Sequence, residues 1–151
     1  MRESQKLRIL FLCTGNSCRS QMAEGWTRHL KGDQIEAYSA GTEPGGPSAR
    51  AVRVMSEAGV HISGHRSKHA DEIKDMAFDY VVTLCDDARR QCPCFPAKVK
   101  IIHVGFDDPP KLAAEASTEQ EALDCYRRVR DEIKAFVEKL PQVLRGDREE
   151  K

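Results

Sequence analysis

Short apolar runs alternate along the chain with longer stretches in which apolar residues recur every three or four positions. Four short runs predict β-strands: 6–13, 35–41, 78–85 and 99–105. The helical spacing predicts helices over 20–30, 48–59, 69–76 and 117–140. Ser117 and Gln120 have the spacing of a capping box at the start of the last helix. Because strands alternate with helices, we expect an α/β fold, a three-layer sandwich with a four-stranded parallel sheet.

Three polar segments follow strands of this predicted sheet. They begin after Leu12, after Leu84 and after Val104. Ligands of open parallel sheets bind at the carboxyl ends of the strands, where loops lead into helices. We therefore expect the three segments to converge on one site.

Length and charge limit the classes of protein that fit. A chain of 151 residues suits a single domain, 1–151, and 40% hydrophobic with 32% charged residues is ordinary for a globular protein. The formal net charge is zero, so bulk electrostatics predicts no nucleic-acid or membrane partner. The sequence has neither a membrane-spanning apolar run nor a signal-peptide pattern, and we expect a cytoplasmic monomer.

Six cysteines change this picture, because a cytoplasmic chain does not use a disulfide framework for stability. They are Cys13, Cys18, Cys85, Cys92, Cys94 and Cys125. Metal binding, redox chemistry and nucleophilic catalysis are the alternatives, beside plain packing as small buried residues. His61, His65 and His69 are spaced by four, but no cysteine or carboxylate completes a ligand set, and we predict no metal site.

The segment CTGNSCRS (13–20) joins the first predicted strand to the first helix. Backbone N–H groups of such a loop point to one spot and bind an anion there. Gly15 permits a sharp turn, and Arg19 can hold two oxygens of a tetrahedral oxyanion. Cys13 at the bottom of the loop is then a nucleophilic thiolate. The predicted anion-binding residues are Thr14, Gly15, Asn16, Ser17, Cys18, Arg19 and Ser20, of which Cys18 is expected to point away and to pack in the core.

CTGNSCRSQMAEG resembles the oxyanion loop of the low-molecular-weight tyrosine phosphatase superfamily, and more closely that of its thioredoxin-coupled arsenate reductases. The phosphatase branch carries a proline where this chain has Gln21. YSAGTEP, DYVVTLC and GFDDP also match the reductase branch, and the resemblance extends over about 7–140. It implies a low-molecular-weight phosphatase-like fold, arsenate as the substrate, arsenite as the product, thioredoxin as the electron donor and no bound cofactor.

The resemblance also implies roles for residues outside the loop. Asp108, directly before a proline, would protonate the departing hydroxyl, and Asp107 remains the alternative acid. Cys85 would attack Cys13 and release arsenite. Cys92 would then attack Cys85, and thioredoxin would reduce the resulting disulfide.

The spacing of Cys85 and Cys92 makes a separate prediction. CDDARRQC is rich in helix formers, and two helical turns separate Cα atoms by about 10 Å. A disulfide requires Cα atoms within about 7 Å. We therefore expect this segment to loop out or unwind on oxidation. Cys94 departs from the family pattern and is an alternative resolving thiol.

Several points stay open at the level of sequence. Some family members bind potassium beside the loop; Asn16, Glu24 and Ser39 match that set, but Lys68 stands at its acidic position, so we expect no bound potassium. Glutaredoxin or a small thiol remain alternative donors. The segment 111–128 is longer than the usual family connection, and Cys125 is interpreted as filler. The rival functions are a protein phosphatase and a non-enzymatic protein that binds arsenite or soft metals through its cysteines.

Overall fold

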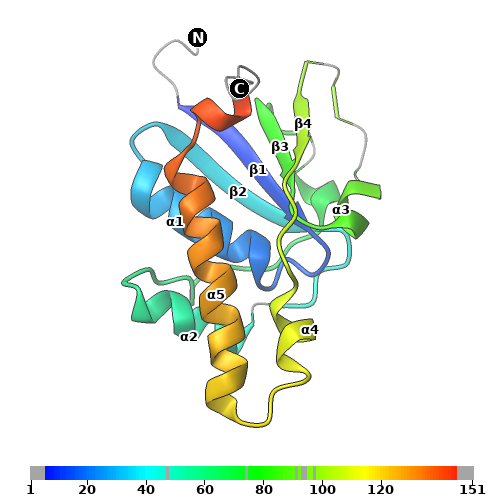
Figure 1. The fold of residues 1–151 in the computed structure, drawn as a ribbon. Helices are drawn as coiled ribbons and strands as arrows, with labels where there is room; N and C mark the ends of the chain where they lie inside the picture. Colours follow the sequence, from blue (N-terminus) through cyan, green and yellow to red (C-terminus); the bar gives the residue numbers. More distant parts are fainter. Residues whose placement is uncertain are drawn as a thin grey trace.

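The computed structural model describes residues 6–46, 48–73, 75–90, 92, 95, 96 and 98–145 (Figure 1). Four parallel strands form one sheet in the order β2-β1-β3-β4: β1 (Leu7–Cys13), β2 (Ile35–Gly41), β3 (Tyr80–Thr83) and β4 (Lys100–His103). The predicted four-stranded parallel sheet is confirmed. β3 and β4 are shorter than the apolar runs that predicted them, because ladder pairing between the two begins at Tyr80 and ends at Thr83.

Helices connect the strands. They are α1 (Arg19–Lys31), α2 (Ala49–Glu57), α3 (Asp86–Arg90), α4 (Pro109–Ala113) and α5 (Glu119–Glu138), with 3₁₀ turns η1 (Ala70–Glu72) and η2 (Gln142–Arg145). Among the described residues of 69–76, where we expected a helix, the only helical element is the 3₁₀ turn η1. No helix in the described ranges is both long and apolar enough to cross a bilayer.

The capping box predicted at Ser117 is wrong by one residue. The Thr118 side chain caps α5 by accepting a hydrogen bond from the Glu121 N–H at 3.1 Å. The Glu121 carboxylate in turn accepts from the Ser117 N–H at 2.8 Å. Both hydroxyl residues satisfy the local pattern, and the register that buries Ala122 and Leu123 in the core places the cap at Thr118.

The sheet is covered on both faces, as a parallel sheet requires. Side chains of β1 alternate between the two faces. Ile9 and Phe11 pack with α1, α2 and α5, whereas Leu10 and Leu12 pack with Ala88 of α3 on the other side. This gives three layers, with the carboxyl ends of β1, β3 and β4 converging at one edge (Figure 1).

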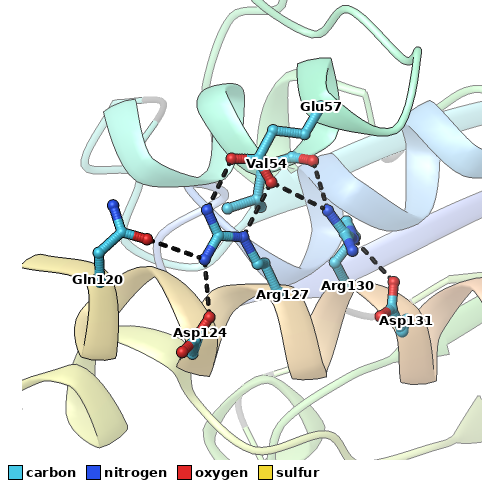
Figure 2. A network of polar contacts seen from close by, with 7 residues as sticks. All are labelled: Val54, Glu57, Gln120, Asp124, Arg127, Arg130 and Asp131. Atoms are coloured by element: carbon cyan, nitrogen blue, oxygen red, sulfur yellow. Dashed lines mark hydrogen bonds and ion pairs between the residues drawn. The ribbon is translucent and has the colours of Figure 1, made fainter.

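A cluster of charged side chains ties the end of α2 to α5 (Figure 2). The Arg127 guanidinium donates to both Glu57 carboxylate oxygens, at 2.9 and 2.8 Å, and this pairing lowers the pKa of Glu57. Arg127 also donates to Asp124 of its own helix, and Arg130 donates to the Val54 carbonyl at 2.9 Å. Exposed ion pairs add little free energy each, so the cluster chiefly fixes where α5 crosses α2.

Candidate active site

The loop between β1 and α1 is held by a second stretch of chain. Residues 42–46 and 48 run alongside it, and four main-chain hydrogen bonds connect the two segments. They are Thr42 N–H to Cys13 O (3.1 Å), Glu43 N–H to Thr14 O (2.8 Å), Gly45 N–H to Gly15 O (2.9 Å) and Ser48 N–H to Ser17 O (3.1 Å). These bonds use the carbonyl oxygens of the loop and none of its N–H groups, which are the groups that would bind an anion.

Asn16 fixes the interior of this loop. Its φ of 49° lies in the left-handed region, which asparagine tolerates better than most residues. The buried side chain donates to Ser20 Oγ at 2.7 Å and accepts from the Lys68 N–H at 2.9 Å. The Asn16 carbonyl also accepts from the Gln21 side chain at 3.1 Å. A single amide thus locks the loop both to α1 and to the segment before η1.

Cys13 lies at the base of the loop with 2% of its surface exposed. Its sulfur is 3.0 Å from Ser20 Oγ. Because Ser20 Oγ already accepts from Asn16, its own hydrogen is free to point at the sulfur. A cavity of about 290 Å³ opens above Cys13, bordered by the loop, Arg19 and Asp108. The cavity has the size and the donors for a small tetrahedral anion.

Arg19 and Asp108 face each other across that cavity. The Arg19 side chain is 11% exposed; it donates to the Phe106 carbonyl at 3.0 Å and lies 3.6 Å from the Asp108 carboxylate. Asp108 occupies the N-cap position of α4 but makes no side-chain cap. Pro109 and Pro110 begin that helix and have no N–H groups to offer. The carboxyl of Asp108 is therefore directed at Arg19 and the cavity.

Asp107 has a different environment. Its carboxylate is paired with Arg128 on α5, which also lies 3.5 Å from Glu132. The two adjacent aspartates thus point to different partners, one toward the anion loop and one toward α5. This separation depends on a contact between residues 21 positions apart and is invisible in the local sequence.

Cys85 lies between β3 and α3, beside the loop. Its sulfur is 3.3 Å from Thr14 Oγ1 and accepts from the Ala88 N–H at 3.4 Å. It lines a second and larger cavity of about 770 Å³, which shares Arg19 and Asp108 with the cavity above Cys13. Two thiols from separate strands therefore open on adjoining cavities. Its contact with Thr14 was not anticipated, since a threonine beside a cysteine gives no pattern in sequence.

Cys92 is half-buried and packs against the core cluster that includes Leu10 and Leu12. The helix expected over 85–92 is observed only as Asp86–Arg90. Cys85 precedes it and accepts from the Arg89 N–H through its carbonyl, while Pro93 in the sequence disfavours helical backbone at Cys92. The predicted unwinding on oxidation stays a prediction. Cys94 lies outside the described residues.

Two further described thiols are Cys18 and Cys125. Like Cys13 and Cys85, they form no disulfide in the described part of the structure. Cys18 packs in the core as expected, although it also borders the cavity above Cys13. Burial raises the pKa of Cys18 to about 11, so this thiol stays protonated at neutral pH. Cys125 is half-buried on α5.

Lys68 occupies the position where the resemblance suggested an ion. Its ammonium donates to the carbonyls of Ser39 at 3.0 Å and Arg66 at 3.4 Å. Burial lowers the pKa of Lys68, and the nearby Glu24 carboxylate opposes that shift. Glu24 also accepts from Ser39 Oγ and pairs with Arg28 at 2.8 Å. The ammonium thus takes backbone oxygens that a monovalent cation would use.

His65 is one of the three histidines spaced by four residues. In the part of the chain that the structure describes, no three or more His, Cys, Asp or Glu side chains are grouped to hold a metal. His65 instead contacts the Gln21 side-chain oxygen at 2.8 Å, and Gln21 reaches the loop at Asn16. Sequence reasoning missed this link, because the two residues are 44 positions apart.

The chain is similar to known proteins in both sequence and fold. The family model described as low molecular weight phosphotyrosine protein phosphatase matches residues 8–150. The chain is 50% identical over 136 residues to an arsenate reductase of Shouchella clausii, covering 89% of this chain and 94% of the relative. An arsenate reductase in its oxidised state aligns with a TM-score of 0.74 at 28% identity, covering 88% and 95% of the two chains. A thioredoxin-dependent arsenate reductase of Corynebacterium glutamicum aligns with a TM-score of 0.68 at 25% identity, covering 93% of this chain and 62% of that one. The chain therefore belongs to the low molecular weight phosphotyrosine protein phosphatase family, among the members named arsenate reductases.

Proposed function

We propose that this chain reduces arsenate to arsenite, with protein thiols as the immediate electron source. The observation that carries the proposal is the position of Cys85, whose sulfur hydrogen bonds with Thr14 inside the anion loop. Hydrolysis of a phosphate ester needs one nucleophile, one cation and one acid, and has no use for a second thiol there. The relatives named arsenate reductases support the same reading.

The first step is attack of the Cys13 thiolate on arsenic. The loop N–H groups and Arg19 hold the arsenate oxygens, and Asp108 protonates the departing hydroxyl, which leaves as water. The carboxyl of Asp108 is suited to this role because it caps no helix and lies beside Arg19. Asp107 is the weaker candidate, since its carboxylate is paired with Arg128.

The second step moves two electrons. The Cys85 thiolate attacks the Cys13 sulfur, the sulfur–arsenic bond breaks, and its electron pair stays on arsenic, which leaves as arsenite. One Cys13–Cys85 disulfide is formed for each arsenic(V) reduced to arsenic(III). Cys92 then attacks Cys85, which frees Cys13 as a thiolate and leaves a Cys85–Cys92 disulfide.

An external dithiol must reduce that last disulfide for turnover, and we propose thioredoxin. The thioredoxin-dependent reductase of similar fold supports this donor. Glutaredoxin and small thiols are the alternatives that the experiment below separates. No prosthetic group takes part in these steps. We propose that the enzyme is a monomer and acts in the cytoplasm, where thiol donors reduce disulfides of this kind.

We also propose that Lys68 takes the part of a bound potassium ion. Its ammonium donates to the Ser39 carbonyl and lies near the Glu24 carboxylate, so the residues present do not fit an additional cation. Activity should then be the same in potassium and in sodium buffers of equal ionic strength.

The test is NADPH consumption with arsenate, thioredoxin and thioredoxin reductase. We expect turnover in the native chain, loss of multiple turnover in Cys92→Ser, and native turnover in Cys94→Ser and in the control Cys125→Ser. Loss in Cys94→Ser alone would move the resolving role to Cys94. Turnover only with glutaredoxin or a small thiol would replace the donor.

Two further outcomes would overturn the proposal itself. Hydrolysis of an aryl phosphate without any arsenate-dependent NADPH consumption would identify a phosphatase. Stoichiometric binding of arsenite without turnover would identify a binding protein.

A further inference from the structure

The imidazole of His103 spans the short turn that carries Cys85. His103 is the last residue of β4 and is the register partner of Thr83, the last residue of β3. Its Nδ1 lies 2.8 Å from Thr83 Oγ1, and its Nε2 lies 3.3 Å from the Asp86 carboxylate. Thr83 and Asp86 stand on either side of Leu84 and Cys85. One ring therefore contacts both ends of the stretch that holds the second thiol.

The hydrogen-bonding chemistry fixes how this ring is oriented. An ionised carboxylate only accepts hydrogen bonds, so the Nε2 that faces Asp86 carries a hydrogen. In the neutral ring Nδ1 is then an acceptor, and it accepts a hydrogen bond from the hydroxyl of the fully buried Thr83. One orientation of His103 thus serves both contacts: a hydrogen bond with Thr83 at one end of the turn, and a 3.3 Å polar contact between Nε2 and the Asp86 carboxylate at the other.

The ring stands directly behind the wall of the larger cavity. A Cβ placed on Gly105 would lie 3.4 Å from His103 Nε2. Gly105, Cys85 and Asp86 all line that cavity. His103 can therefore affect the positions of residues that line the larger cavity, although its own side chain lines neither of the cavities next to the anion loop.

We propose that His103 is a positioning residue for Cys85. Its imidazole ties Asp86 to Thr83, and the restrained turn keeps the Cys85 sulfur directed at Thr14 and the anion loop. This rests on the proposed function, in which Cys85 is the second thiol of the reaction. Without the tie, the Cys85 sulfur is expected to leave its contacts with Thr14 Oγ1 and the Ala88 N–H and to become more exposed.

The test measures how fast Cys85 reacts with iodoacetamide, relative to Cys13 in the same molecule, by peptide mass spectrometry. His103→Asn removes the N–H that faces Asp86 but keeps a polar side chain near Thr83, whereas His103→Gln keeps an N–H where Nε2 was. A hydrogen bond of this kind changes the open population roughly 2- to 10-fold. We expect His103→Asn to raise Cys85 alkylation by about that factor, and His103→Gln to stay near the native rate.

Asp86→Ala provides a second route that does not endanger folding, because the Asp86 side chain is 76% exposed. It should match His103→Asn, and the double variant should show no additional increase. The Ala88 and Arg89 amides donate hydrogen bonds to the sulfur and the carbonyl of Cys85, respectively. Their hydrogen exchange with solvent should accelerate in the same variants. His61→Asn, at an exposed histidine, is the control.

Three results would overturn the inference: native Cys85 rates in both His103→Asn and Asp86→Ala, equal increases in His103→Asn and His103→Gln, or a parallel increase at Cys13. None of these measurements uses arsenate. Unchanged alkylation with intact arsenate turnover would therefore reject the role of His103 alone, while altered alkylation without any native turnover would reject the proposed function alone.

Discussion

Gly41 lies against main-chain atoms of the anion loop, and replacing it with alanine tests whether the geometry of the loop controls activity. Gly41 ends β2, next to Cys13 in the parallel register. A Cβ at this position would lie 2.9 Å from the Asn16 nitrogen and closer still to the Thr14 carbonyl oxygen. Both are main-chain atoms, so no side-chain rotation relieves the clash. The loop must retreat by about 1 Å to restore ordinary van der Waals contact.

The size of the expected effect follows from that displacement. A misplacement of about 1 Å in a catalytic group costs roughly 100-fold in rate, or about 2.7 kcal/mol in the barrier. Overpacking costs about 1 to 3 kcal/mol of folding free energy. For a chain of this length that lowers Tm by roughly 3 to 9 °C. Gly41→Ala should thus remain folded at 25 °C while losing most of its activity.

The assays are arsenate-dependent NADPH consumption and hydrolysis of an aryl phosphate, both at 25 °C, with Tm measured by calorimetry. Because both reactions use the same loop, both values of kcat/KM should fall together. Gly64→Ala is the matched control, since a Cβ at Gly64 meets nothing within 4 Å. If Gly41→Ala keeps more than a third of native kcat/KM in both assays, the loop does not depend on contact with Gly41 and the reasoning is refuted.

Four other substitutions test separate parts of the site. Asn16→Ala forces alanine into a left-handed backbone, which costs about 1 to 2 kcal/mol. It also removes the side-chain hydrogen bonds to Ser20 and Lys68, so calorimetry should show a lower Tm. Asp108→Asn should lower kcat roughly 10²- to 10⁴-fold, whereas Asp107→Asn should stay within about 3-fold; the reverse order would exchange their roles. The Cys18 pKa is raised in the folded state, so its stabilising contribution is complete below about pH 9 and is lost as pH rises toward 11. Denaturant titrations should show a loss of about 2 to 3 kcal/mol across that range that is absent in Cys18→Ala.

The fold followed from sequence because its main signals are local. β2 begins and ends at the predicted residues, since its alternating pattern reflects one strand with distinct faces. The start of α5 did not follow, because Ser117 and Thr118 carry equivalent capping signals and burial of the helix face selects between them. Local pattern predicts which element forms, whereas its ends depend on packing.

The site divides in the same way. The role of CTGNSCRS as a loop before a helix is readable from contiguous residues, and the structure places Cys13 and Arg19 at one cavity, with Asn16 buried in the loop behind it. The different orientations of Asp107 and Asp108 were not readable, because Arg128 on α5 makes the difference. Contacts between distant segments give no pattern in a single sequence.

The four main-chain hydrogen bonds that Thr42, Glu43, Gly45 and Ser48 make with the anion loop have an evolutionary consequence. Because these four bonds join main-chain atoms, they do not depend on the identity of the side chains at these positions. Glu43 and Gly45 are exposed at its rim. Mutation can therefore alter the surface that an incoming substrate or protein meets while the inner chemistry is inherited unchanged. A scaffold of this kind allows one ancestral loop to diversify into enzymes with different substrates.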